Sequence, residues 1–172
     1  MAGAPTQTQA PMTARDRASL KAALEATKGE FRDLVGEIRD EDWAKPTGNA
    51  AWSVRELTFH LSSSQFVAQL AERAAKGGGG FNPLSLLPRS ILDRLSVIYV
   101  RRGARKATPA SLIESYDAGI ARTIAAMESV GDGDWSREVK TFDEKRTLNQ
   151  VFELSIDHMK EHAPEIRAAI SR

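Results

Sequence analysis

Apolar residues recur every three or four positions along four long stretches of this chain, and this is the spacing of one face of an α-helix. Each stretch opens on a residue that can cap a helix: Thr13, Ser53, Thr108 and Thr147. The stretches run to about Asp40, Ala75, Val130 and the C-terminus. We therefore expect an all-α protein in which four amphipathic helices form a four-helix bundle.

The segments between these stretches predict how the helices run relative to one another. The turn between Trp43 and Trp52 is short, so the first two helices are expected to be antiparallel. Residues 77–107 are long enough for a crossover, with a short helix over residues 90–100, and residues 139–142 suggest a brief extended piece before the last helix. The predicted topology is up-down-down-up, with the long crossover between the second and third helices.

The composition indicates one soluble domain. Residues 1–13 are rich in Ala, Pro, Gln and Thr and predict a disordered tail ahead of a domain over residues 14–172. Lys and Arg (24) balance Asp and Glu (23), so no overall charge favours nucleic acid or an anionic membrane. Since the chain also shows no signal-peptide pattern and no membrane-span pattern, we expect a cytoplasmic protein.

Two parts of the long connection leave alternatives open. The basic run at residues 101–106 is either a solvated loop or a site for an anionic group of a substrate. The apolar residues 81–87 follow four glycines, and they form either a lid over a site or a plain disordered loop.

All three histidines of the chain fall on predicted inward helix faces. His158 and His162 are four residues apart, so their imidazoles share one face of the last helix. Such a pair is either a metal-binding pair or two solvated surface histidines, and the position of His60 in the second helix decides between the two.

Helix geometry places the three histidines at similar heights. At about 1.5 Å per residue, His60 lies roughly 22 Å from the end of the second helix. His158 and His162 lie roughly 15 and 21 Å from the start of the fourth helix. In antiparallel helices these heights agree to within about one turn, which predicts a convergent metal site.

The segment from Trp52 to Leu61, together with His158-x-x-x-His162, resembles the DinB-like superfamily. This superfamily includes the N-terminal domains of mycothiol-dependent maleylpyruvate isomerases. The resemblance covers about residues 14–171. It implies an up-down-down-up bundle, a divalent metal held by His60, His158 and His162, and a homodimer.

Three neutral imidazoles would hold a divalent ion, zinc, nickel or iron, with a coordination position open to water or substrate. Because the chain contains no cysteine, sulfur chemistry at this ion requires a low-molecular-weight thiol as cosubstrate. Acceptors for the second ring N–H groups are expected among Glu56, Ser64, Asp117, Asp157 and Glu161. The sequence assigns no catalytic residue.

The leading functional hypothesis is a thiol-dependent S-transferase or isomerase acting on a small molecule. The second is a metal-dependent hydrolase that uses the same three histidines. The third is a non-catalytic dimeric bundle with a structural or vestigial metal site.

Overall fold

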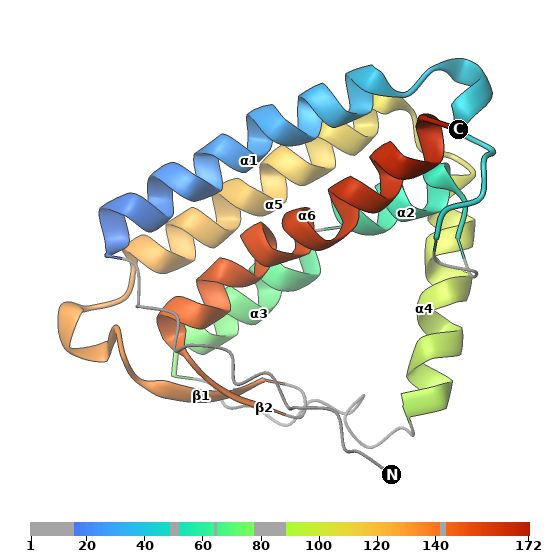
Figure 1. The fold of residues 1–172 in the computed structure, drawn as a ribbon. Coiled ribbons are helices and arrows are strands. Elements are labelled where there is room, and N and C mark those ends of the chain that lie inside the picture. The colour runs from blue at the N-terminus through green and yellow to red at the C-terminus, as the bar shows by residue number, and fades with distance from the viewer. Residues whose placement is uncertain (1–15, 49–51, 64, 78–88, 142–143) are drawn as a thin grey trace, which may run out of the picture.

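The computed structural model describes residues 16–48, 52–63, 65–77, 89–141 and 144–172, and most of these residues are helical (Figure 1). The helices are α1 (Arg17–Glu37), α2 (Val54–Ser62), α3 (Gln65–Ala75), α4 (Arg89–Ala104), α5 (Pro109–Glu128) and α6 (Leu148–Ile170). Short 3-10 turns occupy Asp40–Asp42 and Asp132–Asp134. The predicted all-α class agrees with this content. The predicted tail, residues 1–13, lies outside the described residues.

Local capping sets where the long helices begin. The side chain of Asp16 accepts a hydrogen bond from the Ser19 backbone N–H at 2.7 Å, so α1 begins at Arg17. Asp16 is therefore the cap in place of Thr13, which lies outside the described residues.

The predicted starts at Ser53, Thr108 and Thr147 are confirmed as the N-caps of α2, α5 and α6.

The prediction of a single helix from Ser53 to Ala75 is wrong, because α2 ends at Ser62 and α3 begins at Gln65. Ser62 and Ser63 both donate their hydroxyl hydrogens to the carbonyl oxygen of Phe59, at 2.8 and 2.9 Å. Serine side chains that bond nearby backbone groups compete with the regular helix pattern. The backbone of Ser63 leaves the helical conformation, with ψ at 32°.

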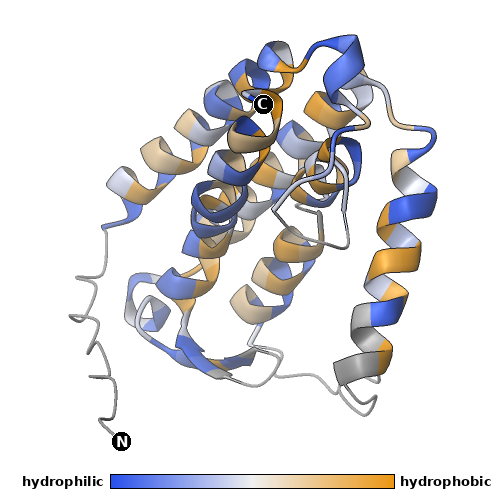
Figure 2. Ribbon diagram, turned by 45° about the vertical axis from the view of Figure 1, so that its right-hand side comes forward, coloured by the Kyte–Doolittle hydropathy of each residue, from blue (hydrophilic) through white to orange (hydrophobic). Residues whose placement is uncertain are grey.

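The connection after α3 contains α4, a helix longer than the one predicted over residues 90–100. Figures 1 and 2 show α4 standing apart from the other helices along most of its length. Its anchor is the C-terminal end, where Gly103 lies against the ring of Phe59 in α2. Four large apolar side chains of α4 are exposed, of which Tyr99 also contacts the rings of Phe59 and Phe66: Ile91, Leu95, Ile98 and Tyr99.

The core lies between α1, α2, α3, α5 and α6. Figure 1 shows α1 and α5 side by side and running in opposite directions, with α6 and α3 beside them. Phe31 of α1 stacks on Tyr116 of α5 with ring centroids 4.3 Å apart. The fully buried side chains include Leu20, Leu24, Leu34, Leu57, Leu61, Leu112, Ile120, Met127, Leu148 and Phe152. Within the described residues, none of the helices combines the length and the apolar composition that a membrane crossing needs.

A two-stranded hairpin precedes α6. Strands β1 (Glu138–Thr141) and β2 (Glu144–Thr147) pair in antiparallel register, with Glu138 opposite Thr147. The predicted extended piece at residues 139–142 is thus confirmed up to Thr141, and residue 142 lies outside the described residues.

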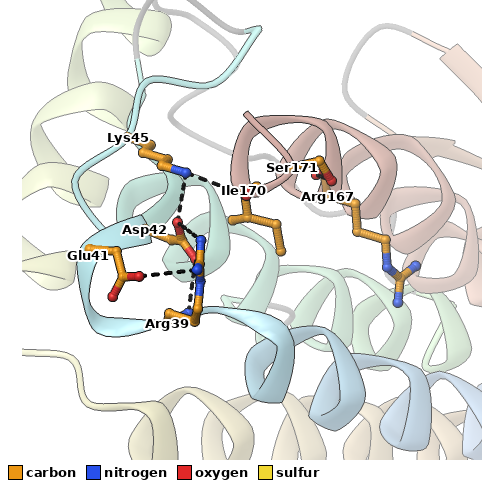
Figure 3. Close-up of polar contacts among 7 residues, drawn as sticks. All are labelled: Arg39, Glu41, Asp42, Lys45, Arg167, Ile170 and Ser171. Atoms are coloured by element: carbon orange, nitrogen blue, oxygen red, sulfur yellow. Dashed lines mark hydrogen bonds and ion pairs between the residues drawn. The ribbon is translucent and has the colours of Figure 1, made fainter.

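A buried carboxylate organises the turn that follows α1. The side chain of Asp42, which is 1% exposed, pairs with Arg39 Nε at 3.0 Å and with Lys45 Nζ at 2.8 Å (Figure 3). Lys45 also donates to the carbonyl oxygen of Ile170 at 3.4 Å. These contacts join the turn to the C-terminal end of α6.

Candidate metal centre

Two helices bring the three histidines together. His60 lies in the last turn of α2, and His158 and His162 lie one turn apart on α6, which packs against α2. The ring centroids of His60 lie 4.7 Å from His158 and 5.4 Å from His162, and those of His158 and His162 are 4.6 Å apart. One ring nitrogen of each residue lies within 4.8 Å of those of the other two. The predicted convergence is therefore present in the fold.

Capping and packing explain the position of His60. The backbone N–H of Ser53 donates to Glu56 Oε2 at 2.9 Å, which fixes the first turn of α2. Leu57 and Leu61 are fully buried in the core. His60, which lies between them in the sequence, faces His158 and His162 of α6. The Trp52 indole packs against the His60 ring at a tilt of 36°, with ring centroids 4.5 Å apart.

The surroundings keep two of the imidazoles neutral. Burial lowers the pKa of His158 to about 3, and the neighbouring histidines add to this effect. Burial also lowers the pKa of His60 to about 4, with a further contribution from His162. A neutral imidazole offers a nitrogen lone pair to a metal ion, so both residues are in the form that binds metal at neutral pH.

His162 is buried and has a carboxylate beside it. Its Nδ1 lies 3.3 Å from Oε2 of Glu165, one turn along α6. Since an ionised carboxylate only accepts hydrogen bonds, a neutral His162 that donates from Nδ1 to Glu165 would keep the lone pair of Nε2 for a metal ion. Such contacts orient ligating histidines in metal sites.

Glu165 is not among the acceptors predicted from the sequence. The signal was its position three residues after His162, a spacing at which side chains meet on a helix.

None of the five acceptors predicted for the ring N–H groups shows that role among the described contacts. Glu56 caps α2 and pairs with Arg101 at 3.6 Å, and Asp117 forms an ion pair with Arg32 of α1. Ser64 lies outside the described residues, and no described contact joins Asp157 or Glu161 to a histidine.

The donor set fits a divalent transition metal. Imidazole nitrogens suit zinc, nickel, iron and copper, whereas calcium and magnesium prefer oxygen ligands. Metal–nitrogen bonds are about 2.0–2.1 Å long, so the three nitrogens, which lie within 4.8 Å of one another, would have to move closer together to share one ion. Three protein ligands leave a coordination position open, which is typical of catalytic sites.

The two alternatives for the long connection have different outcomes. Residues 81–87, for which a lid or a loop was predicted, lie outside the described residues. The basic run is partly helical, since Arg101 and Arg102 form the last turn of α4, and both side chains are exposed. Their exposure fits a solvated segment, but residues 101–104 are helical where a loop was predicted, and the anion-site alternative stays a prediction.

Comparison with protein families and solved structures gives concordant results. Residues 24–156 match the family described as mycothiol maleylpyruvate isomerase N-terminal domain, which confirms the resemblance to the DinB-like superfamily. The matched segment contains His60 and ends before His158. No curated protein sequence matches the chain.

Two solved structures share the fold. One is the crystal structure of a mycothiol-dependent maleylpyruvate isomerase, with 13% sequence identity and a TM-score of 0.66. The other is a histidine-to-alanine mutant of such an enzyme, with 13% identity and a TM-score of 0.64. Each match covers 88% of this chain and 61% of the solved chain, so the present chain spans about three fifths of the length of these proteins.

Proposed function

The chain belongs to the mycothiol maleylpyruvate isomerase N-terminal domain family, and from this membership we propose that it binds a divalent metal ion through His60, His158 and His162 and acts as a thiol-dependent S-transferase or isomerase. The convergence of three imidazoles from two helices is the observation that carries the proposal.

The protein's own residues prepare the site for the ion. Burial and mutual repulsion hold His60 and His158 neutral, and Glu165 orients His162. When bound, a divalent ion would lower the pKa of a thiol and favour the thiolate, which is the nucleophilic form. Zinc, nickel and iron all suit this ligand set.

A small thiol would supply the sulfur that this cysteine-free chain lacks. The family name and the two solved relatives both mention mycothiol, which supports a thiol cosubstrate. Because the chain spans about three fifths of those relatives, we propose two reactions for the site: the isomerisation named for those relatives, or a transfer of the thiol to another small electrophile.

We also propose the finer features that the resemblance implies. The pair α2 and α3 together would count as the second helix of an up-down-down-up four-helix bundle over residues 14–172, with the segment around α4 as the crossover. A homodimer and a cytoplasmic location complete this proposal.

Metal analysis of protein purified without a histidine tag tests the site first. We expect about one equivalent of zinc, nickel or iron, and less than about half an equivalent in the His158→Ala variant. A low metal content that His158→Ala leaves unchanged would reject both the transferase and the hydrolase.

Thermal melting with and without mycothiol then separates the remaining functions. A stability gain with the thiol that is lost in His60→Ala supports the thiol-dependent enzyme. Metal binding without any thiol effect favours the metal-dependent hydrolase or the non-catalytic bundle.

A further inference from the structure

A pocket of about 180 Å³ opens directly beside His158. Among the described residues, its walls are Phe66, Val67 and Leu70 of α3 and Leu154 of α6, with His158 itself. Leu154 precedes His158 by four residues, so both side chains lie on the same face of α6. The pocket is therefore continuous with the face that carries the three histidines.

Apart from His158, the described residues that line this pocket are apolar. No charged side chain is among the described residues that line it. Moving a carboxylate into such surroundings is costly unless a cation or a hydrogen-bond donor accompanies it. The part of the pocket formed by α3 and Leu154 thus favours a hydrocarbon group.

The volume indicates the size of the group that the pocket can hold. An apolar cavity of roughly 150 Å³ is known to admit one benzene molecule. The pocket beside His158, at about 180 Å³, has room for one ring or a chain of similar size.

An exposed aromatic side chain stands at the edge of the pocket. Phe66 is 58% exposed, and its ring packs edge-on against Tyr99 of α4, with centroids 5.9 Å apart. The Tyr99 ring also packs against the ring of Phe59 of α2, with centroids 5.8 Å apart. These contacts hold the Phe66 ring beside the pocket, where its exposed surface is available to an apolar ligand.

We propose that this pocket binds an apolar substrate group of about six carbon atoms, aliphatic or aromatic, while the reacting end of the substrate lies at the three histidines. The inference rests on the proposed function, because only a metal site at these histidines gives the pocket a reacting end to serve. Val67, Leu70 and Leu154 then set the size of the group that is accepted.

The first experiment measures ligand binding to the pocket in the absence of metal. Linear alcohols from ethanol to hexanol are titrated into the metal-free protein, and binding is followed by the NMR shifts of the Val67, Leu70 and Leu154 methyl groups. We expect the affinity to rise by up to about fourfold for each added methylene group that is buried. An affinity that does not depend on chain length would overturn the inference, whether or not the protein binds metal.

The second experiment tests whether one ligand can occupy the pocket and the metal site at the same time. Acetohydroxamate and hexanohydroxamate, whose hydroxamate groups bind metals, are compared as ligands of the zinc-loaded protein by calorimetry. Hexanohydroxamate should bind at least tenfold more tightly. Equal affinities would show that the pocket does not serve the metal site, whereas a failure of zinc itself to bind rejects the proposed function and leaves the alcohol series as the test of the pocket.

Two matched variants assign the effect to the pocket. Val67→Phe fills the pocket and should abolish the advantage of hexanohydroxamate while leaving acetohydroxamate and zinc affinities unchanged. Ala121→Phe adds the same ring in a separate groove between α1 and α5 and should keep the advantage. An advantage that survives Val67→Phe, or is lost in Ala121→Phe, contradicts the assignment.

Discussion

The imidazole of His60 meets that of His158 edge-on, with the ring centroids 4.7 Å apart, although the two residues come from different helices. His162 closes the triangle from one turn further along α6. Because all three rings share one small space, each depends on the other two for any metal-binding role.

Removal of one ring should therefore remove the effect of metal on stability. Zinc at about one hundred times its dissociation constant is expected to stabilise the wild-type protein by about 2.7 kcal/mol, and EDTA should reverse this gain. In His158→Gln, which keeps a side chain of similar size, zinc should give almost no gain. Calorimetric melting measures both values.

Lys160→Gln is the control for this substitution, since it introduces the same residue at an exposed position of the same helix. Its response to zinc should equal that of the wild type. A full zinc effect in His158→Gln would mean that the ion binds elsewhere.

Glu165→Gln should weaken metal binding without abolishing it. The carboxylate lies 3.3 Å from Nδ1 of His162, and loss of such a contact beside a metal ligand typically costs 10–100-fold in metal affinity. Competition with a zinc-binding dye measures the affinity. Glu161→Gln is the matched control, because Glu161 is exposed on the same helix and contacts no histidine among the described contacts. Equal affinities in the two variants would argue against a role for Glu165.

Asp42→Asn should destabilise the protein in a pH-dependent way. Arg39 and Lys45 hold the pKa of Asp42 well below its usual range. A carboxyl with a depressed folded-state pKa adds stability above its unfolded-state pKa of about 3.9 and loses this stability as the pH falls through the folded-state value. We expect Asp42→Asn to melt several degrees below the wild type at pH 7, and the difference should shrink as the pH falls below about 4.

Asp40→Asn provides the comparison for this prediction, because Asp40 is exposed in the same 3-10 turn. Its melting temperature should stay close to that of the wild type. A constant difference between Asp42→Asn and the wild type from pH 7 to pH 3 would be inconsistent with an ionic role for Asp42.

Structural features that depend on residues close in the sequence, such as helix caps, could be predicted from the sequence. The caps at Ser53, Thr108 and Thr147 act within three residues of themselves, and all three were placed correctly. The meeting of His60 with the other histidines was predicted from helix rise, helix face and an assumed antiparallel arrangement, and it is present although the second helix is broken.

The end of α2 and the acceptor beside His162 could not be predicted, because they depend on competing local hydrogen bonds and on side-chain directions. Apolar spacing continues across Ser62 and Ser63, so it could not reveal that their hydroxyl groups bond to Phe59 and end α2. The acceptor beside His162 depends on side-chain directions along α6, so Glu161 was predicted where the fold uses Glu165.

Gly103→Ala should loosen the attachment of α4 to the rest of the protein. A Cβ atom at Gly103 would lie 2.0 Å from Cζ of Phe59, so the ring or the helix must move. Overpacking of this kind costs about 1–3 kcal/mol. Chemical denaturation should show this loss in the free energy of unfolding.

Gly29→Ala is the control, because Gly29 lies in the middle of α1 and a Cβ atom added there would meet nothing within 4 Å. There the same substitution should stabilise the protein by about 0.5–1 kcal/mol, since alanine favours the helix. The two substitutions are therefore expected to have opposite signs.

The double variant Gly103→Ala with Phe59→Leu tests the contact itself. Leucine is shorter than phenylalanine and makes room for the new methyl group, so the loss caused by Gly103→Ala should be smaller in this background. The coupling is expected to reach about 0.5–3 kcal/mol, which is the range for residues in direct contact. Strict additivity of the two substitutions would mean that the Phe59 ring does not limit position 103, and the anchoring of α4 would have to come from its other contacts with α2.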